Sequence, residues 1–339
     1  MKFKMGTCSL STVALLVAAC GGANEKARKT ETISASEALT SSEVQGNVLT
    51  DTAEEITDQL ANLNGSAASF GLSGSKSIDS KTNSTRTCVE GADKTVTISL
   101  DKSFDGSAGG SRVSKSMSFK DSQTRIWSHP TIALKCAENH LDFSLVAGKE
   151  LGLKKDVKYS RTKSSTATGP KKTRSKSVVK EGTRTVEYLA NIGSPDANGY
   201  SLHSLKINSS SSKTIKTDVK GVESALTITS KTTDLLVDEQ KNDSDFSSKL
   251  IKSGTLESSL DNGVEFKLEY SQVKFVNSEE EDSCRPVSGS IVGTIKNADT
   301  TKTFTVTFAE AADPEIKVEG VVSSEIEMDF SGCDFGKAN

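Results

Sequence analysis

Apolar and polar residues alternate along most of the chain after residue 87. A period of two is typical of β-strands that bury one side and expose the other to water. The alternating apolar positions form the following groups: Val96, Ile98 and Leu100; Val113, Met117 and Phe119; Leu141, Phe143 and Leu145; Val264, Phe266, Leu268 and Tyr270; Phe304, Val306 and Phe308; Ile316 and Val318; Ile326, Met328 and Phe330. We therefore expect a mainly β protein built from half-buried strands.

Residues that favour tight turns separate these groups. They are Asp105-Gly106, Asn198-Gly199, Asp261-Asn262-Gly263 and Asn297-Ala298-Asp299. Short turns join antiparallel neighbours, so the pattern predicts a large antiparallel meander of about 13 to 15 strands. A curved sheet, a half-barrel and a sandwich all satisfy this pattern.

The middle of the chain, from Lys154 to Lys231, has long β-prone runs but few large apolar residues. The runs Thr173 to Lys180 and Ser209 to Val219 are rich in Ser, Thr and Lys. Over the whole chain, hydrophobic residues make up 34% and aromatic residues 5%, which suits a sheet with one hydrated face. We expect these hairpins to extend beyond the core or to cover it thinly.

One amphipathic helix is expected at residues 41–64, ahead of the strands. Thr40-Ser41-Ser42-Glu43 has the form of a capping box, and Asn64-Gly65 supplies a stop. The apolar residues at helical spacing are Val44, Val48, Leu49, Ala53, Ile56, Leu60 and Leu63. A linker at 65–86 would then lead into an antiparallel β domain at 87–339.

The start of the chain has the form of an export signal. Lys2 and Lys4 are followed by a small and apolar run from Leu10 to Ala19, which is too short to span a bilayer as a helix. The residues Val17-Ala18-Ala19-Cys20 resemble the lipobox of bacterial lipoproteins. That resemblance implies a signal peptide at 1–19 and a diacylglycerol on the sulfur of Cys20. The polar residues 20–40 would then form a flexible tether.

The same resemblance implies a location. In lipoproteins an aspartate just after the acylated cysteine tends to retain the protein in the inner membrane, whereas Gly21 and Gly22 stand here. We therefore expect lipid anchoring to the outer membrane, on either its periplasmic face or its surface. Several acyl chains on one cysteine supply the two or more signals that stable membrane attachment takes.

Four cysteines remain once the signal peptide, with Cys8, is removed and Cys20 is acylated. An even number in an oxidising compartment favours disulfides, and three pairings are possible. We expect Cys88 to pair with Cys136 and Cys284 with Cys333, because each pair would close a local group of strands. The second bond would make residues 284–333 a disulfide-locked module.

Charge is unevenly spread although the chain carries a net charge of -3. Lys154 to Lys220 holds 15 basic and 5 acidic residues, and Gly221 to Asn339 holds 11 basic and 23 acidic ones. Two interpretations remain open: solvated strand faces that attract each other within the fold, or a basic stretch at 154–220 that faces an anionic lipid or glycan. Nucleic acid is not expected, because the stretch has few aromatic residues for stacking on bases.

No catalytic, cofactor or metal residue is predicted. The three histidines, His129, His140 and His203, have no metal-binding spacing. Trp127-Ser128-His129-Pro130 is interpreted as a turn with a packed indole, with a pocket lining as the alternative. Acidic groups at 238–245 and at 279–282 offer oxygen ligands for Ca²⁺ but lack the EF-hand register, so solvated loops are favoured.

Three functions remain open at this point. The first is a membrane-anchored envelope lipoprotein with a non-catalytic binding or structural role. The second is a periplasmic holder of an apolar ligand, similar in outline to the lipid and lipoprotein carriers, whose sheet is closed by an amphipathic helix. The third is a glycan or peptide hydrolase with carboxylates, or a serine beside a histidine, in one cleft.

Overall fold

A computed structural model describes residues 79–322 of the chain, apart from 110–113, 170–171, 220, 242–245, 262, 279–282, 298–299, 311–314 and 320. The expected signal peptide, acylated Cys20, tether and helix 41–64 lie outside the described residues. So do the strand predicted at Ile326 to Phe330 and the cysteine Cys333.

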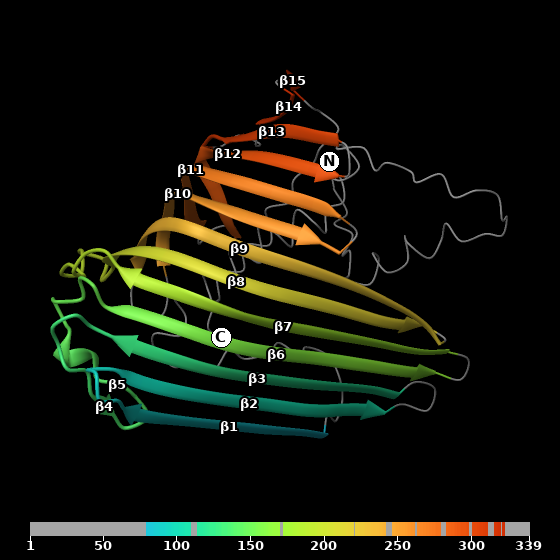
Figure 1. Ribbon diagram of the computed structural model, residues 1–339, viewed down its shortest axis with the longest axis horizontal. Helices are drawn as coiled ribbons and strands as arrows, with labels where there is room; N and C mark the ends of the chain where they lie inside the picture. Colours follow the sequence, from blue (N-terminus) through green and yellow to red (C-terminus); the bar gives the residue numbers. More distant parts are fainter. Residues whose placement is uncertain are drawn as a thin grey trace.

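The described residues form one large antiparallel sheet of thirteen strands (Figure 1). Its order is β1-β2-β3-β6-β7-β8-β9-β10-β11-β12-β13-β14-β15, and β4 and β5 form a separate small hairpin. The strands are β1 Asp79–Glu90, β2 Val96–Gly109, β3 Ser114–Ser128, β4 Cys136–Ala137, β5 His140–Leu141, β6 Lys154–Gly169, β7 Lys172–Tyr188, β8 Ser201–Val219, β9 Val222–Lys241, β10 Phe246–Leu260, β11 Val264–Ser278, β12 Ser283–Asn297, β13 Thr300–Phe308, β14 Glu315–Val318 and β15 Val321–Val322. The predicted antiparallel meander is confirmed. The sequence left a curved sheet, a half-barrel and a sandwich open, and the described strands of the meander belong to one sheet.

The hairpin turns follow the residue chemistry in three of the four predicted places. Between β7 and β8, the Asp196 carboxylate accepts the backbone N–H groups of Asn198 and Tyr200, both at 2.9 Å, and Gly199 takes a positive φ. Gly263 closes the β10–β11 turn by donating its N–H to the Leu260 carbonyl at 3.0 Å. Strand β12 ends at Asn297 and β13 starts at Thr300, so the third predicted turn also lies between two strands.

Two local predictions were wrong. Asp105-Gly106 lies inside β2, where both residues pair with β1 and β3, because the hairpin continues to Gly109 before it reverses. The strand predicted from Leu141 to Leu145 is present only at Leu141, which ends β5. The Asp142 carboxylate caps a 3₁₀ turn at Phe143–Leu145 by accepting the Ser144 N–H at 3.1 Å, and this local hydrogen bond competes with strand formation.

The β-sheet also begins earlier than expected. Strand β1 starts at Asp79, so residues 79–86 are part of the sheet and not of the linker at 65–86. These residues pair with Asp101 to Ser107 of β2 in unbroken register. Their sequence, DSKTNSTR, has no apolar alternation, so the pairing with β2 and not a hydrophobic pattern places them in a strand.

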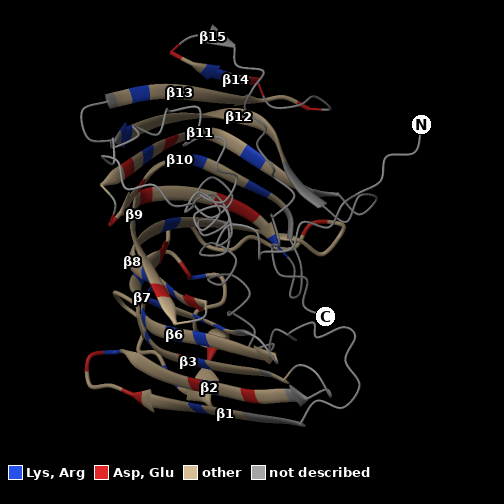
Figure 2. Ribbon diagram, turned by 90° about the vertical axis from the view of Figure 1, so that its right-hand side faces the viewer, with Lys and Arg blue, Asp and Glu red and all other residues tan. Residues whose placement is uncertain are grey.

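The sheet is strongly curved, and β10 to β13 turn over toward the same side as the inner surface of β3 to β7 (Figure 2). Irregularities in neighbouring strands coincide with this bend. Positive φ angles occur at Asp234 in β9, Gly254 in β10, Gln272 in β11 and Gly289 in β12, and the strand registers shift close to these positions. Such β-bulges bend a strand and increase its twist.

Glycine is required at Gly289. Its φ is +96°, and a Cβ there would lie 2.2 Å from the carbonyl oxygen of Gln272. The backbones of β11 and β12 therefore approach closely at the bend, which a side chain would prevent.

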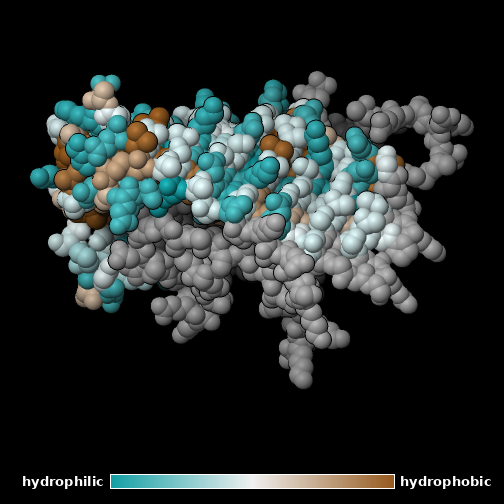
Figure 3. All heavy atoms as spheres, turned by 90° about the horizontal axis from the view of Figure 1, so that it is seen from below, coloured by the Kyte–Doolittle hydropathy of each residue, from teal (hydrophilic) through white to brown (hydrophobic). Residues whose placement is uncertain are grey.

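Buried side chains lie on one face of the curved sheet, called here the inner face. Its apolar part includes Val96 on β2, Leu205 on β8, Val237 on β9 and Val306 on β13, all at most 1% exposed. Seen from below, hydrophobic residues gather at the end of the sheet where β4 and β5 lie, and the strands leading away carry a mostly hydrophilic surface (Figure 3). Among the described residues 161–183 and 209–231, no apolar side chain is buried, so the middle hairpins extend beyond the core, as their composition predicts.

A disulfide joins Cys88 of β1 to Cys136 of β4, which confirms the first expected pairing. It fastens the β4–β5 excursion to the edge of the sheet, where Glu90 also pairs with Lys135 at 2.8 Å and accepts the Cys136 N–H at 3.1 Å. The pairing of Cys284 with Cys333 falls on residues whose side chains are outside the description.

We expect loss of the Cys88–Cys136 bond to destabilise the protein by about 2–4 kcal/mol, because the bond closes a loop of 48 residues in the unfolded chain. Urea unfolding of a Cys88→Ala/Cys136→Ala variant, compared with the parent under non-reducing conditions, measures this. A free energy of unfolding equal to that of the parent would contradict the expectation.

Candidate functional site: a basic surface on the inner face

The candidate site follows from the strict alternation of side chains in β3, β6, β7 and β8. Pairing between these strands has no register shift, so each strand keeps the same residues on the inner face throughout. The described basic residues of that face are Arg125, Lys155, Arg161, Lys163, Arg174, Lys176, Lys180, Arg184 and Lys213.

The acidic residues of the same strands lie almost entirely on the opposite, outer face. Among the described residues of the four strands, Asp121 alone is an inner-face carboxylate, whereas Asp156, Glu181, Glu187 and Asp218 lie outside. The outer face balances them with Lys120, Lys154, Lys158, Lys206 and Lys216. The basic stretch 154–220 therefore becomes a one-sided basic surface in three dimensions.

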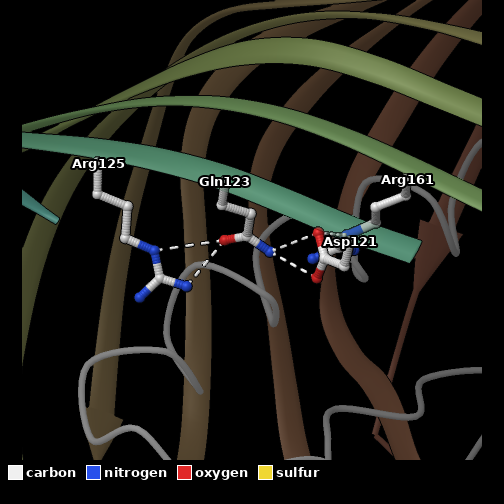
Figure 4. Close-up of polar contacts among 4 residues, drawn as sticks. All are labelled: Asp121, Gln123, Arg125 and Arg161. Atoms are coloured by element: carbon white, nitrogen blue, oxygen red, sulfur yellow. Dashed lines mark hydrogen bonds and ion pairs between the residues drawn. The ribbon is translucent and has the colours of Figure 1, made fainter. Parts of the chain in front are cut away.

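Hydrogen bonds order one end of this surface along β3 (Figure 4). Gln123 donates from Nε2 to both oxygens of Asp121, at 3.1 and 2.8 Å. Its Oε1 accepts from Nε and Nη2 of Arg125, at 3.3 and 2.8 Å. From β6, Arg161 Nε reaches Asp121 at 3.3 Å. The Gln123 amide is thus fixed in one orientation, and it links the Asp121 carboxylate to the Arg125 guanidinium.

Two aromatic rings contact three of the inner-face cations. The guanidinium carbons of Arg161 and Arg184 lie 5.7 and 5.8 Å from the centroid of the Tyr159 ring. That ring lies over Gly182, where a Cβ would be 2.7 Å from the tyrosine oxygen. The Lys155 ammonium lies 5.2 Å from the centroid of Trp127. Cation–π contacts of this kind stabilise buried positive charge without a carboxylate.

Lys155 is buried among these cations, with only 3% of the residue exposed. Its burial disfavours the charged ammonium and holds its pKa well below 10.5, and the nearby charges of Arg125, Arg184 and Lys241 lower this pKa further. A cluster of cations in a partly desolvated place is a strong attractant for anions.

A second polar cluster lies where β8, β9 and β10 pair. Glu239 and Lys249 form an ion pair at 3.1 Å, with side chains only 1% and 3% exposed. His203 lies directly opposite Glu239 on the neighbouring strand. Among the described residues, His203 Nδ1 and Glu239 Oε2 are buried without a hydrogen-bond partner. Tyr188 is buried nearby, and its burial together with Glu239 and Glu150 raises its pKa.

The structure separates the residues considered as candidate metal or catalytic groups. Asp238 and Glu239 are neighbours in β9 and therefore point to opposite faces: Asp238 pairs with Lys252 at 2.6 Å, and Glu239 pairs with Lys249. Residues 242–245 and 279–282 lie outside the description. Within the described part of the chain, no group of three or more His, Cys, Asp or Glu is arranged to hold a metal ion.

The histidines lie on three different elements. His129, after β3, accepts the backbone N–H groups of Thr131 and Ile132 at Nδ1, at 3.2 and 3.0 Å, so its Nε2 donates to the Lys149 carbonyl at 3.0 Å. It is a structural residue of the turn. Trp127 is buried and packs edge-on against Phe143, with ring centroids 5.4 Å apart, as the turn interpretation predicts.

Sequence reasoning missed the polar ladder of β3. Asp121, Gln123 and Arg125 occupy three successive buried positions of β3, between Phe119 and Trp127. A period-two pattern with Asp, Gln and Arg in place of apolar residues is the signal that could have found them.

Comparison with protein-family models, with curated proteins and with solved structures gives no match for this chain. In the described residues, no helix is long and apolar enough to cross a membrane.

We expect Gln123→Met to destabilise the protein by about 1–3 kcal/mol, because the substitution keeps the shape but removes partners from a buried carboxylate and a buried guanidinium. Urea unfolding measures this effect, with Ser122→Met on the exposed outer face of β3 as the control. Equal effects of the two substitutions would contradict the role given to Gln123.

We expect stability to fall as the pH drops below 6.5 and His203 to contribute to that fall. Burial lowers the pKa of His203 below 6.5, an effect that Lys241 increases and that Glu239 and Glu150 oppose. Between the lowered pKa and 6.5 the unfolded chain binds a proton that the folded chain does not, so protonation favours unfolding.

Urea unfolding at about pH 7.5 and about pH 5.5 tests this prediction. The loss of stability on acidification should be smaller in His203→Gln than in the parent, and unchanged in His140→Gln, an exposed histidine of β5. An unchanged loss in His203→Gln would rule out His203 as a contributor.

Proposed function

We propose that this protein is a membrane-anchored envelope lipoprotein that binds a ligand or partner and does not catalyse a reaction, with the inner face of its sheet as the binding surface. The observation that carries the proposal is the separation of charge in β3, β6, β7 and β8, where nine described cations and one carboxylate share the inner face. A surface with one sign of charge selects ligands of the opposite sign.

The arrangement of polar groups favours binding over catalysis. Asp121 already accepts hydrogen bonds from Gln123 and Arg161, and Glu239 is paired with Lys249. General acid–base catalysis uses groups that are within reach of a substrate, whereas these two carboxylates are buried and paired with cations of the protein itself. The Arg and Lys side chains offer hydrogen-bond donors for an anion.

The location of the protein is part of the proposal and rests on the sequence Val17-Ala18-Ala19-Cys20, which resembles a lipobox. Acylation of Cys20 would tether the chain to the outer membrane, and the polar residues 21–40 would let the sheet reach the membrane surface. A disulfide between Cys88 and Cys136 is compatible with an oxidising compartment outside the cytoplasm.

A carrier-like role, in which the sheet holds an apolar ligand, is the second candidate. The observation that favours it is the aromatic and aliphatic part of the inner face on β11 to β13, which includes Phe266, Phe275, Phe304 and Phe308. This apolar part and the basic part belong to the same sheet, and the four phenylalanines are between 5% and 8% exposed.

We expect Cys20→Ala to abolish the incorporation of labelled palmitate and to move the protein out of the outer-membrane fraction, because the acylated sulfur is the proposed anchor. Cys8→Ala, in the part of the chain that would be removed, is the matched control and should behave as the parent. Cleavage and outer-membrane fractionation of Cys20→Ala equal to those of the parent would overturn the proposed anchoring.

A further inference from the structure

Two neighbouring cross-strand rows on the inner face differ in chemistry. The first, called the cation row, is Asp121, Arg161, Lys180 and Lys213, which lie directly opposite one another on β3, β6, β7 and β8. The second, called the mixed row, is Phe104, Phe119, Lys163, Val178, Ile215 and Leu226 on β2, β3, β6, β7, β8 and β9. The mixed row lies two residues further along each of β3, β6, β7 and β8, away from the buried core.

The cation row concentrates positive charge. Side chains directly opposite in antiparallel strands are about 5 Å apart at Cβ, and like charges in that position are unfavourable. Arg161, Lys180 and Lys213 occupy three such consecutive positions, with Asp121 as the carboxylate at one end. Each of these cations has contacts of its own. Over the row itself, three cations and one carboxylate give an excess of positive charge.

Both rows are partly open to solvent. Arg161, Lys180 and Lys213 are half-buried, and so are Phe119, Val178 and Ile215, whereas Lys163 is exposed. A half-buried anion site is stronger than one in bulk water because the surrounding dielectric is lower. Half-buried apolar side chains next to it gain stability when a ligand covers them.

We infer that this part of the inner face binds an anionic lipid, with the phosphate of the headgroup on the cation row and an acyl chain along the mixed row. The inference rests on the proposed binding role and names its ligand class. An acidic glycan would complement the cations but would leave the apolar side chains of the mixed row uncovered. Inorganic phosphate would use the cations alone, so the juxtaposition of the two rows favours a molecule that is both anionic and apolar.

Native mass spectrometry of the full chain, purified in a neutral maltoside detergent, tests this inference. The protein is titrated with dioctanoyl phosphatidic acid, with dioctanoyl phosphatidylcholine, which has the same chains and no net charge, and with inorganic phosphate. We expect phosphatidic acid to bind at least about tenfold more tightly than either of the others, the difference that one charged hydrogen bond supplies.

Two pairs of variants assign the binding to the rows. Lys180→Gln/Lys213→Gln should weaken phosphatidic acid binding about tenfold or more, and Lys158→Gln/Lys216→Gln, which removes the same charge from the exposed outer face, should not. Val178→Thr/Ile215→Thr should weaken phosphatidic acid binding several-fold, whereas Val179→Thr, the neighbour on the outer face, should not. Circular dichroism confirms that each variant is folded.

The inference is overturned if phosphatidylcholine or inorganic phosphate binds as tightly as phosphatidic acid, if nothing binds, or if inner-face and outer-face variants behave alike. Anchoring through Cys20 is measured in cells and lipid binding on purified protein, so either proposal can fail without the other.

Discussion

Unbroken antiparallel register is the constraint on which the rest of this structure depends. Side chains of a strand alternate between two faces, and a slip of one residue would move every side chain to the other face. From β1 to β8 the pairing has no register shift between neighbours. The separation of Arg161, Lys180 and Lys213 from Glu181 and Asp218 therefore depends on each hairpin keeping its register.

Placing cations on the buried side of a sheet costs free energy, and several local features reduce that cost. Asp121 neutralises part of the positive charge. Gln123 connects Asp121 to Arg125, because its amide forms hydrogen bonds with both side chains. Tyr159, which has room for its ring because Gly182 lacks a Cβ, lies between two guanidinium groups. These contacts hold the charged groups in place. Among the described residues of β3, β6, β7 and β8, one inner-face carboxylate lies on the same face as nine Lys and Arg side chains.

Much of the fold could be predicted from the sequence because alternation and turn chemistry are local signals. Val264 to Tyr270 and Phe304 to Phe308 form strands with their apolar residues buried, and Asp261 to Gly263 forms the turn between β10 and β11. The first part of β1, residues 79–86, was missed because its sequence DSKTNSTR has no apolar alternation and its strand conformation depends on pairing with β2. A curved sheet was one of the expected architectures, but the position of its bend was not predicted, because the bulges at Asp234 and Gln272 arise from the relation between strands, which no single strand encodes.

The candidate site could be predicted from the sequence only in part. The basic residues of the stretch can be counted in the sequence. Their division between two faces depends on the register of four strands, and the mixed row depends on the register of six strands. The bend near Gly254 and Gly289 then turns the apolar strands β10 to β13 toward the side on which the cations lie (Figure 2). A flat sheet of the same sequence would place the aromatic part and the basic part side by side, facing solvent. Curvature therefore turns the aromatic part and the basic part of one face toward each other, an arrangement that the order of the strands along the sheet does not by itself produce.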